Sequence, residues 1–119
     1  MIVTDAGFAP DDWTGEVVDL GPDTDEDTLA EHLGAPMIRI AFPTSADGRG
    51  FTLARLLRLR GYRGRLRAKG VIAPQYAMAR RSGFDEVEID DALAARQPEA
   101  LWLSRADWRA HDHQAALRG

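Results

Sequence analysis

Residues 42 to 89 read FPTSADGRGFTLARLLRLRGYRGRLRAKGVIAPQYAMARRSGFDEVEI, and this stretch decides the fold. Short apolar runs alternate in it with longer segments in which leucine or alanine recurs at helical spacing. Such alternation is typical of βαβ units, whose strands form a parallel sheet. We expect strands at 37–42, 65–72 and 86–89, a helix at 51–60 with Leu53, Leu56 and Leu57 inward and Arg55 and Arg58 outward, and a helix at 75–81 that Gly83 closes.

The flanking segments extend the same pattern. A strand at 16–20 precedes a short acidic helix at 24–33, for which Thr24 is the expected N-cap, with Asp27 three residues later. After residue 89 we expect a helix at 90–96, a strand at 101–103, and a last helix that starts with a capping box of Ser104 and Asp107. The sequence therefore predicts an α/β fold: a single small domain over residues 1–119, with alternating βα units, a mostly parallel sheet of about four to five strands, and a frayed tail at 111–119.

Composition excludes several classes of site. The chain has 119 residues, 45% of them hydrophobic, which suits one globular domain that folds without metal or disulfide support. It has no cysteine, which excludes disulfides, thiolate nucleophiles and cysteine-ligated clusters. His111 and His113 are too close in sequence to converge on one metal, so we expect no metal site, and the sequence requires no cofactor. The acidic start and the lack of a long apolar run predict a cytoplasmic protein that does not bind a membrane.

Charge is distributed unevenly along the chain, although the net charge is only −4. Residues 1 to 34 carry ten Asp or Glu and no Lys or Arg, whereas residues 39 to 83 carry eleven Lys or Arg and the single acid Asp47. One interpretation is a basic surface for an anionic partner. The other is intramolecular: the acidic N-terminal segment folds back and neutralises the basic middle. The negative net charge, and arginines that are not interleaved with aromatic residues, disfavour nucleic acid as the partner.

The loop between residues 42 and 51 is the candidate site. It follows an expected strand and precedes an expected helix, so it lies at the carboxyl edge of the sheet, where open α/β sheets bind their ligands. Free N–H groups at a helix start favour an anion, and the Arg49 guanidinium suits phosphate, sulfate or carboxylate. Asp47 either closes an ordinary tight turn or acts as an acid or base, and Arg49 either binds a ligand or forms a surface salt bridge. The anion-binding candidates in this loop are Thr44, Ser45, Gly48, Arg49 and Gly50.

Cationic residues alternate with apolar ones in the expected strand at 65–72, at Arg65, Arg67 and Lys69. One face of this strand is therefore either in solvent, as at a sheet edge, or in contact with an anion. In the second interpretation Arg67 or Lys69 lies beside Arg49 and adds a second positive contact. Gln75 then hydrogen-bonds the same ligand.

A set of short motifs stands out between residues 37 and 89: Phe42-Pro43, Asp47-Gly48-Arg49-Gly50-Phe51, Ala54-Arg55, Leu57-Arg58, Gly61-Tyr62, Gly64, Leu66-Arg67-Ala68, Gly70, Gln75, Arg81 and Gly83-Phe84-Asp85. Together they resemble the bacterial domain-of-unknown-function 934 family. Members of this family are encoded beside sulfite and nitrite reductase genes and are often labelled oxidoreductases, so the resemblance implies a role in assimilatory sulfur or nitrogen reduction. The chain departs from the family pattern at Pro74-Gln75, where members tend to have Asp-Gln, and at Ser82, where they often have Cys.

Two functions fit these features. The first is an accessory or binding protein for assimilatory sulfite or nitrite reduction, which holds a small anionic ligand, or an acidic surface of a reductase partner, at the Gly/Arg loop. The second is a small enzyme, an oxidoreductase in the family's label, in which Asp47 or Asp85 is the acid or base for an anionic substrate held by Arg49. We favour the first because the chain has no cysteine and no complete cofactor fingerprint. The sequence leaves open whether the chain is an enzyme and whether it forms homo-oligomers.

Overall fold

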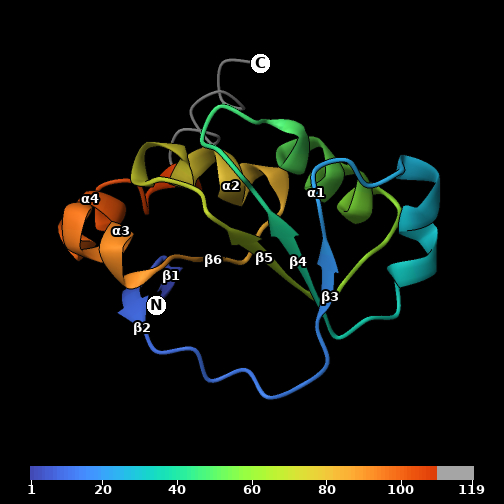
Figure 1. The fold of residues 1–119 in the computed structure, drawn as a ribbon, viewed down its shortest axis with the longest axis horizontal. Helices are drawn as coiled ribbons and strands as arrows, with labels where there is room; N and C mark the ends of the chain where they lie inside the picture. The colour runs from blue at the N-terminus through green and yellow to red at the C-terminus, as the bar shows by residue number, and fades with distance from the viewer. Residues whose placement is uncertain (110–119) are drawn as a thin grey trace.

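The structure is a computed structural model, and it describes residues 1–109. Its six strands form one sheet in the order β2-β1-β6-β5-β4-β3 (Figure 1). Strands β3 to β6 are parallel neighbours in chain order, whereas β1 and β2 form an antiparallel hairpin that pairs with β6. The strands are β1 (Ile2–Thr4), β2 (Gly7–Ala9), β3 (Val18–Leu20), β4 (Met37–Ala41), β5 (Arg65–Lys69) and β6 (Glu86–Glu88).

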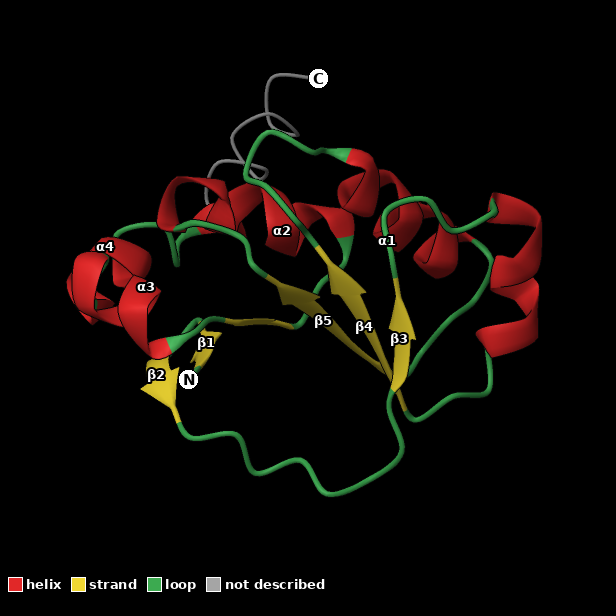
Figure 2. Cartoon of the chain, in the orientation of Figure 1, coloured by secondary structure: helices red, strands yellow, loops and turns green. Residues whose placement is uncertain are grey.

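The helices that connect the parallel strands lie on one side of the sheet (Figures 1 and 2). The 3₁₀ helix η1 (Glu26–His32) connects β3 to β4, and α1 (Arg49–Leu59) connects β4 to β5. The short 3₁₀ helix η2 (Ala73–Gln75) and α2 (Tyr76–Ser82) connect β5 to β6, and α3 (Asp91–Arg96) and α4 (Glu99–Leu103) follow. Because each crossover between these parallel strands has the same hand and steps to the adjacent strand, the crossover helices share one face. Within residues 1–109 there is no helix of the length and apolar character needed to cross a membrane.

The core lies between this face and the helices. The registers place Leu20, Ile40, Ala68, Val87 and Val3 side by side across five strands. All five are buried and belong to one apolar cluster. The helices contribute to the same cluster Leu29 of η1, Phe51, Leu53, Ala54 and Leu57 of α1, and Tyr76 and Ala79 of α2.

The other face of the sheet is charged, because alternate residues of a strand point to opposite faces. Asp19, Arg39, Arg67 and Glu86 are paired across four parallel strands. Residues 10–17, which we call the N-terminal strap, run along this side of the molecule (Figure 1). We call this surface the polar face and define it by Asp19, Arg39, Arg65, Arg67, Lys69, Glu86 and Glu88.

The predicted α/β class is confirmed, with parallel strands inside all four expected strand segments before residue 90. The sheet has six strands, more than the four to five predicted, because the hairpin of β1 and β2 was not predicted and adds two strands. The hairpin belongs to the sheet through the pairing of β1 with β6, a long-range contact that a local sequence pattern does not reveal. The predicted tail at 111–119, with His111 and His113, lies outside the described residues.

Two local predictions are wrong. Residues 101–103, predicted as a strand, end helix α4, and Ser104 is the C-cap of that helix instead of an N-cap. The edge that such a strand would need is occupied, because the N–H of Phe8 in β2 donates to Glu99 Oε2 at 2.8 Å. The expected acidic helix is a 3₁₀ helix that starts later, with Asp25 as its N-cap, since Thr24 donates its hydroxyl to the Gly21 carbonyl at 2.7 Å.

Candidate functional site

Asp47 and Arg49 bind each other in the Gly/Arg loop, residues 43–50. Arg49 Nε and Nη2 donate to the Asp47 carboxylate at 3.0 and 2.7 Å, and the Arg49 N–H donates to it at 3.1 Å. These hydrogen bonds lower the pKa of Asp47 to about 2, which makes its carboxylate a weak base. The structure thus contains the predicted surface salt bridge. The binding role of Arg49 and the catalytic role of Asp47 stay predictions.

The two glycines beside Arg49 have different environments. A Cβ at Gly50 would overlap the Phe42 ring, so this position in α1 must be small for the helix to pack on the end of β4. A Cβ at Gly48 would have no other atom within 4 Å. Packing in the core therefore accounts for glycine at position 50, whereas no packing contact requires glycine at position 48.

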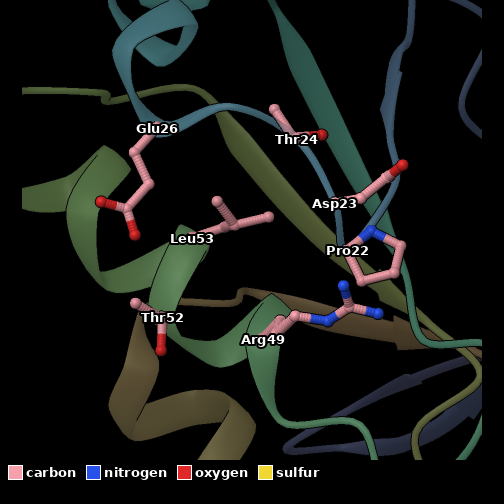
Figure 3. Close-up of a pocket in the computed structure, with 7 residues that line it drawn as sticks. All are labelled: Pro22, Asp23, Thr24, Glu26, Arg49, Thr52 and Leu53. Carbon is pink, nitrogen blue, oxygen red and sulfur yellow. The ribbon is translucent and has the colours of Figure 1, made fainter.

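A hollow of about 480 Å³ lies beside Arg49, between α1 and the segment that follows β3 (Figure 3). Figure 3 shows the Arg49 guanidinium below Pro22 and Asp23. Two carboxylates, Asp23 and Glu26, line the hollow together with this one guanidinium, and Arg49 is already bound to Asp47. The charge of this hollow is therefore unfavourable for a free anion.

Gln75 lies next to the Gly/Arg loop, and its predicted hydrogen bond to a ligand stays a prediction. Its Nε2 donates to the Ser45 carbonyl at 2.6 Å, and its Oε1 accepts from the Ile72 N–H at 3.3 Å. The Thr44 carbonyl accepts from the Asp47 N–H at 3.2 Å, which closes the turn. Thr44 and Ser45 are exposed, so their hydroxyls can reach solvent. In this structure Gln75 ties the loop to the segment after β5.

Arg67 is not near Arg49, contrary to the prediction. Alternation along β5 puts Arg67 on the polar face, whereas α1 covers the opposite face. Its side chain is only 1% exposed. It donates to Glu86 Oε2 at 2.8 Å, to Glu88 Oε1 at 3.0 Å, and to both oxygens of Asp11 at 3.0 and 3.1 Å. These three carboxylates occupy its donors, so Arg67 stabilises the sheet and the strap.

Arg39 lies beside Arg67 on the polar face and is also paired. Its Nε and Nη2 donate to Asp19 at 2.5 and 2.9 Å, and its Nη1 donates to Glu88 Oε1 at 3.1 Å. The hydrogen bonds with Asp19 raise the pKa of Arg39, and the same bonds lower the pKa of Asp19. Hydrogen bonds from Arg67 likewise lower the pKa of Asp11. All these groups remain charged at neutral pH.

A third N-terminal acid, Asp5, reaches the helical side of the fold. It accepts from Tyr76 Oη at 2.5 Å and from Arg80 Nη2 at 3.1 Å. Asp5, Asp11 and Asp19 thus each bind an arginine from residues 39 to 83. The acidic N-terminal segment folds back onto the basic middle, as the intramolecular interpretation of the charge pattern predicts.

Asp85 lies at the opposite edge of the sheet from Asp47, because it precedes β6 whereas Asp47 follows β4. Asp85 Oδ2 accepts from Arg58 Nη2 at 2.9 Å and from the Leu66 N–H at 2.8 Å. The two candidate acid/base residues therefore lie at different sites. At its site, Asp85 forms structural hydrogen bonds with Arg58 and with the backbone of β5.

Arg58 is the centre of that contact and is half-buried, where an outward side chain was predicted. Its Nε donates to the Gly83 carbonyl at 2.9 Å, and its Nη1 donates to the carbonyls of Tyr62 and Gly64 at 3.0 and 2.9 Å. Arg58 therefore joins the loop after α1 to the loop after α2. Tyr62, Gly64, Gly83 and Asp85, which belong to the motifs noted between residues 37 and 89, meet here, which indicates a structural role for them.

A second hollow lies at the carboxyl ends of β4, β5 and β6, and we call it the carboxyl-edge pocket. Its volume is about 510 Å³, and its charged lining residues are Lys69, Glu88, Asp90 and Arg96. Lys69 was predicted as an anion-binding residue, whereas Arg96 was not predicted. The sequence feature that could have pointed to Arg96 is its three-residue spacing from Leu93, and of Leu93 from Asp90. This spacing places the three residues on one side of α3.

Lys69 and Arg96 have donors to spare, unlike Arg39 and Arg67 on the polar face. The Lys69 side chain is 56% exposed, and its nearest carboxylate oxygen, on Glu88, is 3.9 Å from Nζ. Arg96 is exposed and has no hydrogen bond or ion pair with any residue in the described part of the chain. Within residues 1–109, no group of side chains is arranged to hold a metal ion.

Comparison with known proteins identifies a family for this chain. Residues 17–117 match the family described as bacterial protein of unknown function (DUF934). No curated protein and no solved structure shows significant similarity to the chain. The match begins just before β3 and includes the parallel strands, the Gly/Arg loop and the carboxyl-edge pocket. Because the match covers most of its length, the chain belongs to the DUF934 family of bacterial proteins of unknown function.

Proposed function

We propose that this protein is an accessory binding protein that holds a small anionic ligand in the carboxyl-edge pocket and acts beside an assimilatory sulfite or nitrite reductase. The observation that carries the ligand-binding part is the pair of available cations, Lys69 and Arg96, in one hollow at the carboxyl ends of three parallel strands. Ligands of open α/β sheets bind at this edge. The link to a reductase comes from the family resemblance alone.

Electrostatics favour the carboxyl-edge pocket over the Gly/Arg loop as the place where an anion binds. Arg49 is bound to Asp47 and shares its hollow with two further carboxylates. In the carboxyl-edge pocket, Glu88 already accepts from Arg39 and Arg67, so its charge is largely compensated. An arriving anion therefore meets more unused N–H donors beside Lys69 than beside Arg49.

A binding function is favoured over the enzyme alternative by the two candidate carboxylates. The pKa of Asp47, about 2 because of its hydrogen bonds from Arg49, is far from the range in which a general base works at neutral pH. Asp85 Oδ2 is taken by Arg58 and by a backbone N–H. Neither group lines the carboxyl-edge pocket.

Calorimetric titration with sulfate, sulfite, phosphate and benzoate tests the binding proposal. The double variant Lys69→Ala/Arg96→Ala should lose at least tenfold in affinity for every anion that binds. The matched control Arg55→Ala/Arg105→Ala removes the same charge from exposed positions outside the pocket and should bind like the wild type. Equal losses in both double variants would contradict the proposed site.

Asp47→Asn separates the pocket from the Gly/Arg loop. The substitution removes the charge that neutralises Arg49. If the loop held the anion, the freed guanidinium would tighten binding; with the ligand in the carboxyl-edge pocket, affinity should stay within about twofold of the wild type. The same variant would lose turnover, with binding retained, if Asp47 were an acid/base residue.

The link to a reductase is tested in a bacterial strain that lacks the gene. This strain should grow slowly with sulfate or nitrate as the nutrient source, and normally with cysteine and ammonium. The wild-type gene should restore growth, and the Lys69→Ala/Arg96→Ala gene should not. Normal growth of the deletion strain on sulfate and on nitrate would refute the link while leaving the binding proposal intact.

A further inference from the structure

The walls of the carboxyl-edge pocket are largely apolar. Phe42, Pro43, Ile72, Ile89 and Leu93 line it together with the charged residues. Phe42 and Ile89 are 5% and 4% exposed and form its floor. An ion without apolar surface would leave Pro43, Ile72 and Leu93, which are exposed or half-buried, in contact with water.

The size of the pocket also exceeds what an inorganic oxyanion needs. Its volume, about 510 Å³, falls within the range of roughly 300–1,000 Å³ that is typical of sites for small organic ligands and cofactors. A sulfate or nitrite ion bound by Lys69 and Arg96 would leave most of this space to water. A ligand with a ring or a branched chain would fill it.

The carboxylates of the pocket are already engaged. Glu88 Oε1 accepts from Arg39 and Arg67 at 3.1 and 3.0 Å. Asp90 Oδ1 accepts from the Leu93 N–H at 2.7 Å as the N-cap of α3. The unused donors belong to Lys69 and Arg96, so the charged end of a ligand that binds here is an anion.

We infer that the carboxyl-edge pocket binds an amphipathic organic anion: one carboxylate or sulfonate that contacts Lys69 and Arg96, on an apolar ring or branched chain that packs against Ile72, Leu93 and Pro43. The inference rests on the proposed function and narrows the class of ligand. Lys69 at the end of β5 and Arg96 on α3 approach the pocket from two elements, so the anionic group lies between them. The apolar body then points to the floor made by Phe42 and Ile89.

A titration series that varies the body and the charge of the probe tests the inference. Benzoate, cyclohexanecarboxylate and benzenesulfonate have both parts, acetate and sulfate have only the charge, and benzylamine has the same ring with the opposite charge. The Kd of the first three should be at least about tenfold lower than that of acetate or sulfate, because burial of the ring removes apolar surface from water. Benzylamine should bind at least tenfold more weakly than benzoate.

Two variants identify the groups responsible. Leu93→Asn should remove most of the advantage of benzoate over acetate, whereas Leu103→Asn, at an exposed leucine outside the pocket, should leave it unchanged. Ile72→Thr is the second pocket variant if Leu93→Asn does not fold. Lys69→Ala/Arg96→Ala should weaken the binding of every anion and should not weaken the binding of benzylamine, since the carboxylates of Glu88 and Asp90 remain.

The outcomes separate this inference from the proposed function. If acetate and sulfate bind as tightly as benzoate, and Lys69→Ala/Arg96→Ala weakens them, the inference is overturned and the proposed function stands. If no probe binds, or if benzylamine binds as tightly as benzoate, both are overturned.

Discussion

Asp11 and Arg67 are 56 positions apart in the chain, and their side chains form a two-pronged ion pair with N–O distances of 3.0 and 3.1 Å. The pair attaches the N-terminal strap to the middle of the sheet. It also leaves Arg67, the most buried cation of the polar face, with no donor directed at solvent. A residue that looks available for a ligand in the sequence is thus part of the scaffold.

Removal of Arg67 should destabilise the protein strongly. Arg67→Ala leaves a cavity beside the carboxylate of Glu86, whose side chain is 3% exposed, and reduces the partners of this buried charge from two arginines to Arg65 alone. Breaking a buried pair in this way typically costs about 3–5 kcal/mol of unfolding free energy. Urea denaturation followed by circular dichroism at pH 7 measures the loss.

The double variant Arg67→Met/Glu86→Leu is the control for this interpretation. It replaces both charges with apolar side chains of similar volume, so most of the lost stability should return. If the double variant is as unstable as Arg67→Ala, the ion pair between Arg67 and Glu86 itself contributes the stability. The burial of the Glu86 carboxylate without Arg67 would then not explain the loss.

Acid should weaken the attachment of the strap. Hydrogen bonds from Arg67 and Arg39 lower the pKa values of Asp11 and Asp19 below the usual 3.8. The unfolded chain therefore binds protons at a higher pH than the native chain. The resulting stabilisation is complete above about pH 5 and is lost as the pH falls below 4 through the lowered pKa values.

Urea midpoints measured between pH 7 and pH 2.5 check this pH dependence. Asp11→Asn should be less stable than the wild type at pH 7, and the difference between them should shrink below pH 4. Asp12→Asn is the matched control, since Asp12 is the exposed neighbour of Asp11 and has no hydrogen bond or ion pair with any residue of the described part of the chain. A difference between wild type and Asp11→Asn that is constant from pH 7 to pH 2.5 would rule out the proposed contribution of this carboxylate.

The two glycines of the Gly/Arg loop should respond differently to alanine. Gly50→Ala pushes a methyl group into the Phe42 ring, and overpacking of this kind costs about 1–3 kcal/mol. At Gly48 a methyl group would have open space, and the φ of −88° suits alanine. The unfolding free energy of Gly48→Ala should therefore stay within about 0.5 kcal/mol of the wild-type value. Thermal unfolding of both variants decides the matter, and equal destabilisation would contradict the packing explanation for Gly50.

Arg58 should matter more for stability than its neighbour Arg55 on the same helix. Arg58→Ala leaves carbonyl oxygens of two loops without their donor and unpairs Asp85, which we expect to cost about 2–4 kcal/mol. Arg58→Lys should recover little, because an ammonium group does not reproduce the guanidinium fork. Arg55→Ala, at an exposed position, should change stability by less than about 0.5 kcal/mol. Equal losses at the two positions, measured by chemical denaturation, would exclude the structural role assigned to Arg58.

Much of the fold could be predicted from local sequence signals. The end of α2 is an example, because Gly83 adopts a φ of 115° that favours glycine. β4 is another, since an apolar run follows Pro36 and ends before a turn. The hairpin of β1 and β2 could not be predicted in this way, because it is defined by pairing with β6, a strand more than 80 residues away.

The candidate site was less predictable than the fold. Alternation along β5 shows that Arg67 and Lys69 share a face, but not that Asp11 covers one of them and leaves the other exposed. The pairing of Lys69 with Arg96 in one pocket depends on how α3 folds back after β6. Such tertiary contacts have no local signature in the sequence.

The N-terminal hairpin also determines how the molecule can grow in an assembly. Its outer strand is shielded, since Glu99 takes up the Phe8 N–H. Among the described strands, β3 is the one at the other end of the order, where a neighbouring chain can add by backbone hydrogen bonds. A strand that added edge to edge to this sheet would therefore pair with β3, because Glu99 already takes up a backbone donor of the hairpin at the opposite edge.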